Sequence, residues 1–175
     1  VLPMPTGLSV AGIPATPICP GTSVTLTPSA TGSGTGTLYY SWDGTTYVEA
    51  GDDGFTLTIT PDATVSYTLY VKEVRTVGGV EYDCAPAELP VTVNVYDQPV
   101  LSIGTLTHLD CNGVNDGKIP ASATGGTPFA GGYYEFSLDN VHFTHNTGSN
   151  LTQWTFTELM GGDYTVYVRD QHCTD

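Results

Sequence analysis

The sequence predicts an all-β protein built from two β-sandwich modules in tandem. Three observations support this fold class: an internal repeat, a composition rich in turn and strand residues, and two cysteines in each half of the chain. The 175 residues include 21 glycines and 12 prolines, but only four lysines and arginines together. Because side chains that favour exposed helices are scarce and no amphipathic helical stretch is present, strands and turns are expected throughout.

The repeat consists of two pairs of matching segments. Residues 40–47 read YSWDGTTY and residues 136–143 read FSLDNVHF, so an aromatic residue, Ser, an apolar residue and Asp follow each other in both. Residues 66–73 (SYTLYVKE) are matched by residues 163–170 (DYTVYVRD), at almost the same separation. A repeat unit of about 96 residues is too long for a solenoid and has the size of one small β-domain.

Alternation of apolar and polar residues predicts the strands of the first module in chain order. The sets that would face the core are Val24 and Leu26; Tyr40 and Trp42; Phe55, Leu57 and Ile59; Tyr67, Leu69 and Val71; and Val91, Val93 and Val95. Threonine fills many of the intervening positions, as expected for the solvent face of an antiparallel sheet. Turn residues separate these runs, and Gly78-Gly79 predicts a hairpin between two of them.

The second module repeats this order. Its core-facing sets are Leu101 and Ile103; Ile119, Ala121 and Ala123; Tyr134, Phe136 and Leu138; Trp154 and Phe156; and Tyr164, Val166 and Val168. About seven short strands, with turns roughly every ten residues, are typical of an immunoglobulin-like (Ig-like) sandwich, so each module is predicted to be one. Trp42 matches the large aromatic residue buried in such folds, and Tyr67 and Tyr164 resemble tyrosine corners.

The boundary between the modules is predicted at residues 97–99 (DQP), which gives an Ig-like module at 1–97 and a second module at 98–175. A connection this short that contains a proline predicts limited swing between them. The first module ends on an alternating run at residues 90–96, and no equivalent run follows Cys173. We therefore expect the second module to be cut before its last strand.

Each module holds two cysteines, Cys19 and Cys84 in the first and Cys111 and Cys173 in the second. Four cysteines permit three pairings, and the sequence alone does not choose among them. If each module folds by itself, one bridge within each module is the pairing that respects the repeat. Such a bridge would stabilise a module by about 4 kcal/mol on the chain-entropy model and would indicate an exported, oxidising location. The alternatives are buried free thiols or a zinc site, although no Cys-x-x-Cys spacing is present.

The chain is strongly acidic, with 18 acidic residues against four basic ones and a net charge of −14. This charge repels phosphate backbones and anionic membranes, which argues against nucleic-acid partners. No apolar run approaches the length of a membrane-spanning helix, so membrane insertion is not expected. An acidic coat of this kind suits a soluble surface protein, and weak attraction of Ca²⁺ stays open.

No cofactor and no metal site is predicted. Residues 110–117 contain the acidic turn residues of a calcium loop, but Val114 stands where the fifth ligand belongs and Ala121 where the bidentate Glu belongs. His142 and His145 lie three residues apart in a strand-like segment, so they would point to opposite faces and be solvated. The chain also lacks a nucleophile elbow, a zinc-protease motif and a phosphate loop, so no catalytic residue is predicted and the protein is not expected to be an enzyme.

Surface aromatic residues are the candidate ligand contacts, because they offer contact area at low entropic cost and can stack on sugar rings. Alternation points Tyr70 and Tyr167 outward, each beside a basic residue, and Tyr133 and Trp154 lie near predicted loops. The alternative interpretation is structural: Tyr70 and Tyr167 would pack on neighbouring threonines, and Trp154 would cap the core.

Several segments of the second module form a recognisable series in order: CNGVNDG at 111–117, GGTP at 125–128, FSLD at 136–139, LMGGDYTV at 159–166, and VRD followed by Cys173 at 168–173. This series, from about residue 100 to 173, resembles the SprB-type repeat of very large cell-surface adhesins in gliding Bacteroidota. The aromatic insert at residues 129–134 departs from that pattern. The first module is similar only to the Ig-like modules that accompany such repeats.

The resemblance implies a non-enzymatic piece of an adhesin that is exported by the type IX secretion system and pulls on a substratum. The leading hypothesis is therefore a structural and adhesive segment of a bacterial cell-surface filament involved in surface attachment or gliding motility. Its partners would be an extracellular surface or polysaccharide and the neighbouring repeats of the same chain. The rival is a carbohydrate-binding accessory module of a secreted polysaccharide-degrading enzyme, and a third option is a passive spacer.

Overall fold

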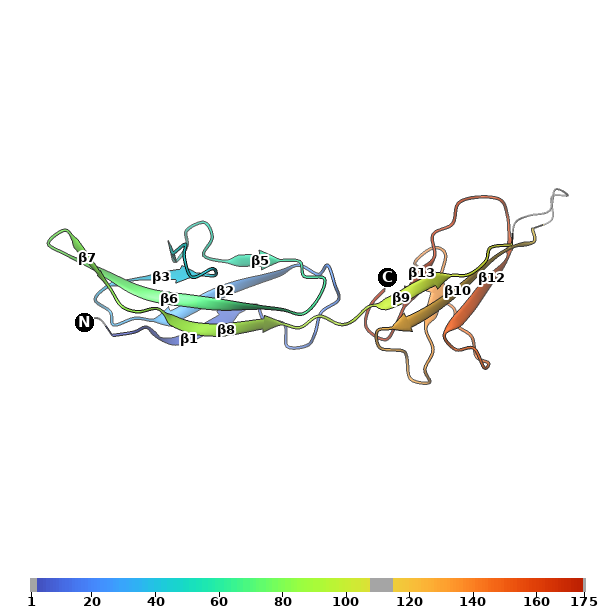
Figure 1. Cartoon of the computed structure of the whole chain (residues 1–175), viewed down its shortest axis with the longest axis horizontal. Helices are drawn as coiled ribbons and strands as arrows, with labels where there is room; N and C mark the ends of the chain where they lie inside the picture. The colour runs from blue at the N-terminus through green and yellow to red at the C-terminus, as the bar shows by residue number, and fades with distance from the viewer. Residues whose placement is uncertain (1–2, 108–114, 175) are drawn as a thin grey trace. The chain divides into compact units, whose positions relative to one another are not determined.

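The computed structural model of the chain describes residues 3–107 and 115–174 (Figure 1). The described residues form strands joined by turns and loops and contain no helix, which confirms the all-β prediction. Accordingly, that part of the chain offers no helix long and apolar enough to cross a membrane. The chain divides into two compact units, Val1–Val95 and Tyr96–Asp175.

The first unit forms two antiparallel sheets. One sheet has the order β1-β2-β5; the other has the order β4-β3-β6-β7, with β8 paired along the first half of β6. The strands are β1 (Thr6–Ala11), β2 (Val24–Thr31), β3 (Thr37–Ser41), β4 (Val48–Glu49), β5 (Leu57–Ile59), β6 (Val65–Val77), β7 (Val80–Asp83) and β8 (Ala87–Val93). The predicted hairpin at Gly78-Gly79 is present, because β6 and β7 pair across it from Val77 and Val80 onward.

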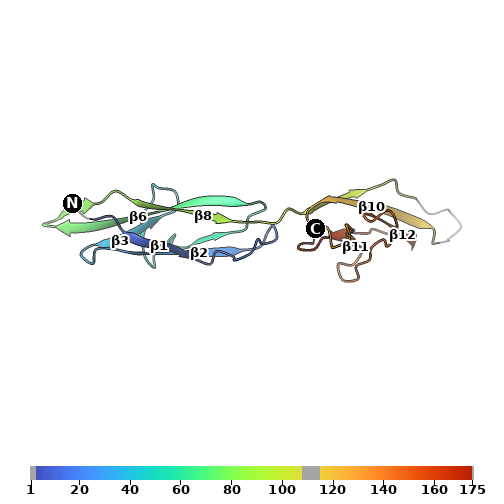
Figure 2. The ribbon, with the colours of Figure 1, turned by 90° about the horizontal axis from the view of Figure 1, so that it is seen from below.

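The two sheets of the first unit pack face to face on one apolar core (Figure 2). One buried cluster joins β2 to β8 and comprises Val24, Leu26, Val91 and Val93. A second cluster joins β3 to β6 and comprises Tyr40, Leu69 and Val71. Trp42 and Leu89 pack against both clusters, so the core is continuous. The buried positions alternate with exposed ones along β2 and β8, as the sequence predicts.

The second unit also has two antiparallel sheets, but fewer strands are found in its described residues. One sheet has the order β12-β10-β9, and the other consists of β11 and β13. The strands are β9 (Pro99–Ile103), β10 (Gly117–Gly125), β11 (Glu135–Ser137), β12 (Gln153–Leu159) and β13 (Tyr167–Arg169). Its buried core, drawn from both sheets and the residue before β11, consists of Ala121, Ala123, Tyr134, Phe136 and Val168.

Two strands of the second unit differ from the expectation. The alternating run from Tyr164 predicts a strand through Val168, but β13 begins only at Tyr167. The run from Tyr134 to Leu138 likewise contains only the short strand β11. Alternation correctly predicts Tyr134, Phe136 and Val168 as inward, since all three are buried. The prediction is wrong for Tyr164, which precedes β13 and is 39% exposed, and for Ile103 at the end of β9, which is 47% exposed. The extent of each strand depends on its pairing partner.

The two tyrosines that resemble tyrosine corners behave differently. The Tyr164 hydroxyl donates a hydrogen bond to the carbonyl oxygen of Met160, four residues upstream, at 3.0 Å. Tyr67 instead packs edge-on against Trp42, with ring centroids 6.5 Å apart. The second unit therefore has the corner contact, and the first unit uses the equivalent ring for packing.

The structure corrects the predicted cysteine pairing. Cys84 is a buried free thiol, and its Sγ accepts a hydrogen bond from the backbone N–H of Glu73 at 3.3 Å. Cys19 and Cys173 are both disulfide-bonded, so neither is bonded to Cys84. The prediction of one bridge within each module is therefore wrong, because the thiol of Cys84 is held against the backbone of β6 and takes no part in a bridge. Cys111 lies outside the described residues.

Candidate functional site

The Ser-x-Asp motif of the repeat forms a self-capped turn in the first unit. Ser41 Oγ donates to Asp43 Oδ1 at 2.8 Å. Asp43 Oδ1 also accepts hydrogen bonds from the backbone N–H groups of Thr45 and Thr46, each at 2.7 Å. The bond from Thr46, followed by that from Thr45, holds the pKa of the Asp43 carboxyl far below its usual value. The turn is therefore stabilised by a charged carboxylate at neutral pH.

The second unit builds the same turn with one addition. Ser137 Oγ donates to Asp139 Oδ1 at 2.8 Å, and this oxygen accepts the N–H groups of Val141 and His142 at 2.9 and 2.8 Å. The His142 ring nitrogen Nδ1 lies 2.6 Å from the other oxygen, Asp139 Oδ2. This side-chain bond is the first cause that holds the pKa of Asp139 far below its usual range, followed by the backbone bonds. His142 is exposed, as expected, but it has a partner.

A basic side chain lies on the aromatic ring that ends each turn motif. Lys72 Nζ is 4.6 Å from the centroid of the Tyr47 ring, and Arg169 Cζ is 4.1 Å from that of Phe143. These residues occupy equivalent positions in the repeat, so both units contain the same cation–π contact. Arg169 also pairs with Glu135, whose Oε2 lies 2.6 Å from the guanidinium Nη2. The guanidinium is thus fixed by a ring and a carboxylate.

A buried carboxylate ties the β2–β3 loop of the first unit to its sheet. Glu73 on β6 is fully buried. Its carboxylate accepts the Ser33 hydroxyl at 2.5 Å and the N–H groups of Ser33 and Gly36 at 2.7 and 2.8 Å. These hydrogen bonds, the Ser33 hydroxyl first, lower the pKa of Glu73 even though burial raises it. A charge can be buried here because several donors satisfy it.

Asp170 plays the same role at the equivalent position of the second unit. It is 3% exposed. Its carboxylate accepts the N–H groups of Thr127, His172 and Cys173 at 2.6, 2.8 and 2.7 Å. Gly126 has a positive φ of 58°, and a Cβ at that position would overlap the Asp170 carboxylate. The glycine lets the loop approach the acid closely.

Three aromatic rings stack on the surface of the second unit, and we call Phe129, Tyr133 and His145 the aromatic patch. The Phe129 and Tyr133 rings are nearly parallel with centroids 5.1 Å apart, and the Tyr133 and His145 rings are 4.1 Å apart. A tight turn aligns the first two rings, because Phe129 N–H donates to the Tyr133 carbonyl and Gly132 N–H to the Phe129 carbonyl. His145 Nδ1 lies 3.6 Å from Glu135 Oε1, which connects the patch to the Glu135–Arg169 pair.

The four predicted ligand contacts occupy different environments. Tyr133 lies in the aromatic patch. Trp154 packs against the core of its unit, and Tyr167 is half-buried on β13. Tyr70 is on β6, and its ring packs against the Ser-x-Asp turn of the first unit, where a Cβ at Gly44 would be 3.2 Å from the ring. Of the four residues, Tyr133 therefore stacks with other aromatic rings, whereas Tyr70 and Trp154 have packing roles within their own units.

Sequence reasoning missed most of the surface around Tyr133. His145 and Glu135 are close to Tyr133 and Arg169 only because β11 pairs with β13 and Thr144 bridges Phe136. The one signal in the sequence is the aromatic insert at residues 129–134, which departs from the repeat pattern. An insert that differs between two similar modules is a reasonable place to look for a module-specific contact.

The described residues contain no group of three or more His, Cys, Asp or Glu side chains that could hold a metal ion. Most of the calcium-like segment at 110–117 lies outside the described residues. No protein-family model matches the chain, and no curated protein is similar to it. Stacked rings beside a guanidinium that is held by a carboxylate suit reversible binding of a polar, ring-containing ligand.

Proposed function

We propose that the chain is a non-enzymatic structural and adhesive segment of a large exported cell-surface adhesin, made of two tandem Ig-like modules, the second of them a SprB-type repeat. The strand order of the first unit supports the Ig-like part of the proposal. Sheets β1-β2-β5 and β4-β3-β6-β8 match strands A-B-E and C′-C-F-G of such sandwiches. The strand order β9, β10, β11, β12 and β13 then gives A, B, C, E and F in the second unit.

The observation that carries the proposal is the way the first unit secures its C-terminal end. Ile18 N–H donates to the Asn94 carbonyl at 3.0 Å and forms a parallel bridge with Val95. Val95 N–H donates to Thr64 Oγ1, also at 3.0 Å. Tension pulling along the chain through Val95 loads these bonds together in shear and not one after another. Such an arrangement suits a module that transmits force.

Adhesion would come from the aromatic patch with the adjacent Arg169. Rings supply contact area at little entropic cost, and a guanidinium held by Glu135 and Phe143 loses little freedom on binding. An extracellular polysaccharide is the partner that such a surface fits. A disulfide-containing chain whose described residues include no membrane-spanning helix is compatible with export to the cell surface, and the type IX system is the proposed route.

The test is retention of beads under flow. Beads coated with the full chain are expected to stay on hydrated polysaccharide or glass at a shear that removes beads coated with an inert protein. The variant Phe129→Ser/Tyr133→Ser should lose retention, while Tyr82→Ser, an exposed tyrosine of the first unit, should keep it. Retention equal to that of inert beads would leave the chain a passive spacer and refute the adhesive role.

A carbohydrate-binding accessory module is the second candidate, and the aromatic patch is the observation that favours it. A glycan array separates the two functions because an accessory module should select one polysaccharide backbone, whereas an adhesive segment should bind several surfaces. Tyr133→Ala is expected to abolish selective binding. Tyr70→Ala serves as the matched control, since Tyr70 packs on the Gly44 turn of the other unit.

A further inference from the structure

The second unit shows no counterpart of β8 among its described residues. Its strands otherwise repeat the first unit: β10 and β12 pair as β2 and β5 do, and β11 and β13 pair as β3 and β6 do. In the first unit β8 runs antiparallel along β6 from Val65↔Val93 to Val71↔Ala87. The corresponding edge of β13 carries no such strand among the described residues.

The pairing of β11 shows which backbone groups of β13 face this open edge. Phe136 exchanges two backbone hydrogen bonds with Thr144, at 2.7 and 2.9 Å, on the side of β11 away from β13. Phe136 lies opposite Val168, so this is a non-hydrogen-bonded pair and the Val168 N–H and C=O point away from β11. The open edge therefore presents backbone donors and acceptors to a further strand.

A turn directs the chain back along the same edge. Asp170 N–H donates to the Cys173 carbonyl at 3.0 Å, and Arg169 forms an antiparallel bridge with Thr174. The Asp170 carboxylate secures this turn through the N–H groups of His172 and Cys173. A strand that continues from the turn would run antiparallel to β13, as β8 runs along β6.

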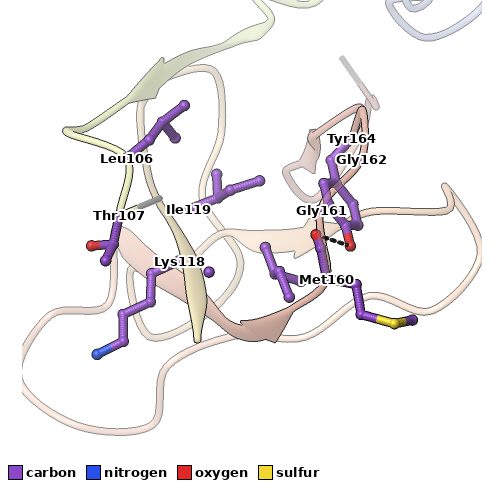
Figure 3. Close-up of a pocket in the computed structure, with 10 residues that line it drawn as sticks. Leu106, Thr107, Lys118, Ile119, Met160, Gly161, Gly162 and Tyr164 are labelled. Atoms are coloured by element: carbon purple, nitrogen blue, oxygen red, sulfur yellow. Dashed lines mark hydrogen bonds between the residues drawn. The ribbon is translucent and has the colours of Figure 1, made fainter. Parts of the chain in front are cut away.

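A pocket of about 360 Å³ lies at Tyr164, three residues before β13, and is otherwise lined from β10, the end of β12 and residues 106–107 (Figure 3). The Tyr164 ring and the side chains of Leu106 and Ile119 border it, with Lys118 at its margin. Large apolar side chains are unusually exposed here, since Leu106 is 45% exposed and Met160 is 65% exposed. Its lining consists of Leu106, Thr107, Gly117, Lys118, Ile119, Leu159, Met160, Gly161, Gly162 and Tyr164.

The first unit shows what fills the equivalent space. Ile119 pairs with Phe156 as Val24 pairs with Ile59, so Ile119 is the counterpart of Val24. Val24 is 7% exposed because it packs in one cluster with Val91 and Val93 of β8, whereas Ile119 is only partly buried and lines the pocket. The pocket is thus the place that the inward side chains of a last strand would occupy.

We propose that the open edge of β13 and this pocket together form an acceptor site for a polypeptide strand, continuous with the turn at residues 170–174, that carries apolar residues at alternate positions. Backbone hydrogen bonds to β13 would hold the strand, and its inward side chains would enter the pocket. The register follows from the bridge between Arg169 and Thr174. The inference rests on the comparison of the two units and does not depend on the adhesive function.

The test appends the sequence of residues 88–95 (ELPVTVNV) directly after Asp175 of the full chain. In the register set by the Arg169–Thr174 bridge, the copy of Leu89 falls opposite Val166, as Leu89 lies opposite Leu69 in the first unit. The matched control inserts one threonine before the same eight residues. A shift of one residue turns every apolar side chain of the strand to solvent without changing its composition otherwise.

Amide hydrogen exchange at residues 165–168 is the measurement. The in-register extension is expected to slow exchange there by about tenfold or more, since a covalently attached strand has a high effective concentration, and the control should resemble the unextended chain. Equal exchange in both extended chains, or protection at β9 or β12 instead, would overturn the proposal. Protection that depends on protein concentration would place the strand in another molecule and would overturn the continuous hairpin.

Discussion

Residues 66–73 and 163–170 have nearly the same sequence but form strands of very different length. In the first unit they belong to β6, which covers thirteen residues, whereas β13 in the second unit covers three. β6 has β3 on one edge and β7 and β8 on the other, while β13 is paired with β11. The comparison shows that alternation predicts the inward residues where the strand is paired, and that the neighbouring strand decides how far the ladder extends.

What the two units share is a set of polar contacts. Each has a Ser-x-Asp turn, a base on the ring that ends this turn, and a buried acid that ties a glycine-rich loop to the sheet. The apolar residues differ more, since Ala121 lies where the first unit has Leu26. Packing tolerates such changes if volume is made up elsewhere, whereas a hydrogen-bonded carboxylate needs its donors in place. The predictions below test this shared polar framework from its largest effect to its smallest.

Removing the buried acid of the first unit should have the largest effect. Glu73→Ala is expected to lower the free energy of unfolding of that unit by about 3 kcal/mol, because it removes a fully buried carboxylate that accepts hydrogen bonds from Ser33 and Gly36. Urea unfolding followed by Trp42 fluorescence in a Trp154→Phe background reports on this unit. Glu88→Ala, which removes an exposed acid, is the control. A loss equal to the control would mean that the loop does not need the acid.

The equivalent change in the second unit should be smaller. Asp170→Ala is expected to cost about 2 kcal/mol, because the shorter side chain leaves a smaller unfilled space, while the exposed Thr127 and His172 can bond to water. Trp154 fluorescence in a Trp42→Phe background measures the unfolding of this unit. Asp163→Ala removes an exposed acid nearby and is the matched control. A loss larger than that of Glu73→Ala would reverse the comparison.

Much of this framework could be predicted from the sequence only in outline. The repeat and its alternation predict the β class and most of the inward residues, because the pleat alternates with a period of two, although Ile103 and Tyr164 are exposed. The matching acids at positions 73 and 170 are visible in the alignment of the two halves. Their burial is not, since an acid at a strand position normally implies an exposed side chain. It depends on a glycine loop that folds over from more than thirty residues away.

The cysteines show a different limit. Equal spacing of two pairs favours bridges within each module, but spacing says nothing about where a thiol points. Cys84 follows β7, and its backbone N–H donates to the Glu73 carbonyl, which places its thiol against β6. The aromatic patch could not be predicted from the sequence either, because the fold brings Tyr133 and His145 together and no repeated motif contains both.

Acid should weaken both Ser-x-Asp turns. Asp43 and Asp139 have a folded pKa far below the usual Asp value of about 3.9, so the stability they contribute is present above that pH and is lost as the pH falls through the folded pKa. The free energy of unfolding is therefore expected to decline below about pH 4 in both units. Asp139→Asn should flatten the decline followed at Trp154 and leave that followed at Trp42 unchanged. An unchanged slope at Trp154 would show that Asp139 does not drive it.

The cation–π contacts should contribute less. Lys72→Met and Arg169→Met keep much of the side-chain length and remove the charge above Tyr47 and Phe143. Each is expected to lower the stability of its own unit by about 1 kcal/mol, since these side chains are partly exposed. Denaturation at low and high salt measures the share of each loss that comes from an ion pair, because Lys72 also pairs with Asp83 and Arg169 with Glu135, and salt weakens both pairs. Equal stability of variant and parent would show that the cation–π contact does not stabilise its unit.

The smallest effect should come from Cys84, and it bears directly on the corrected pairing. Cys84→Ala removes one buried thiol and its weak bond to the Glu73 N–H, while the backbone bond to the Glu73 carbonyl remains. A loss of at most about 1 kcal/mol is expected, against about 4 kcal/mol for a lost bridge between Cys19 and Cys84. Trp42-monitored unfolding measures the difference, and alkylation of the denatured, unreduced chain checks the thiol. A loss of several kcal/mol, together with a newly reactive Cys19, would restore the bridge within the first unit.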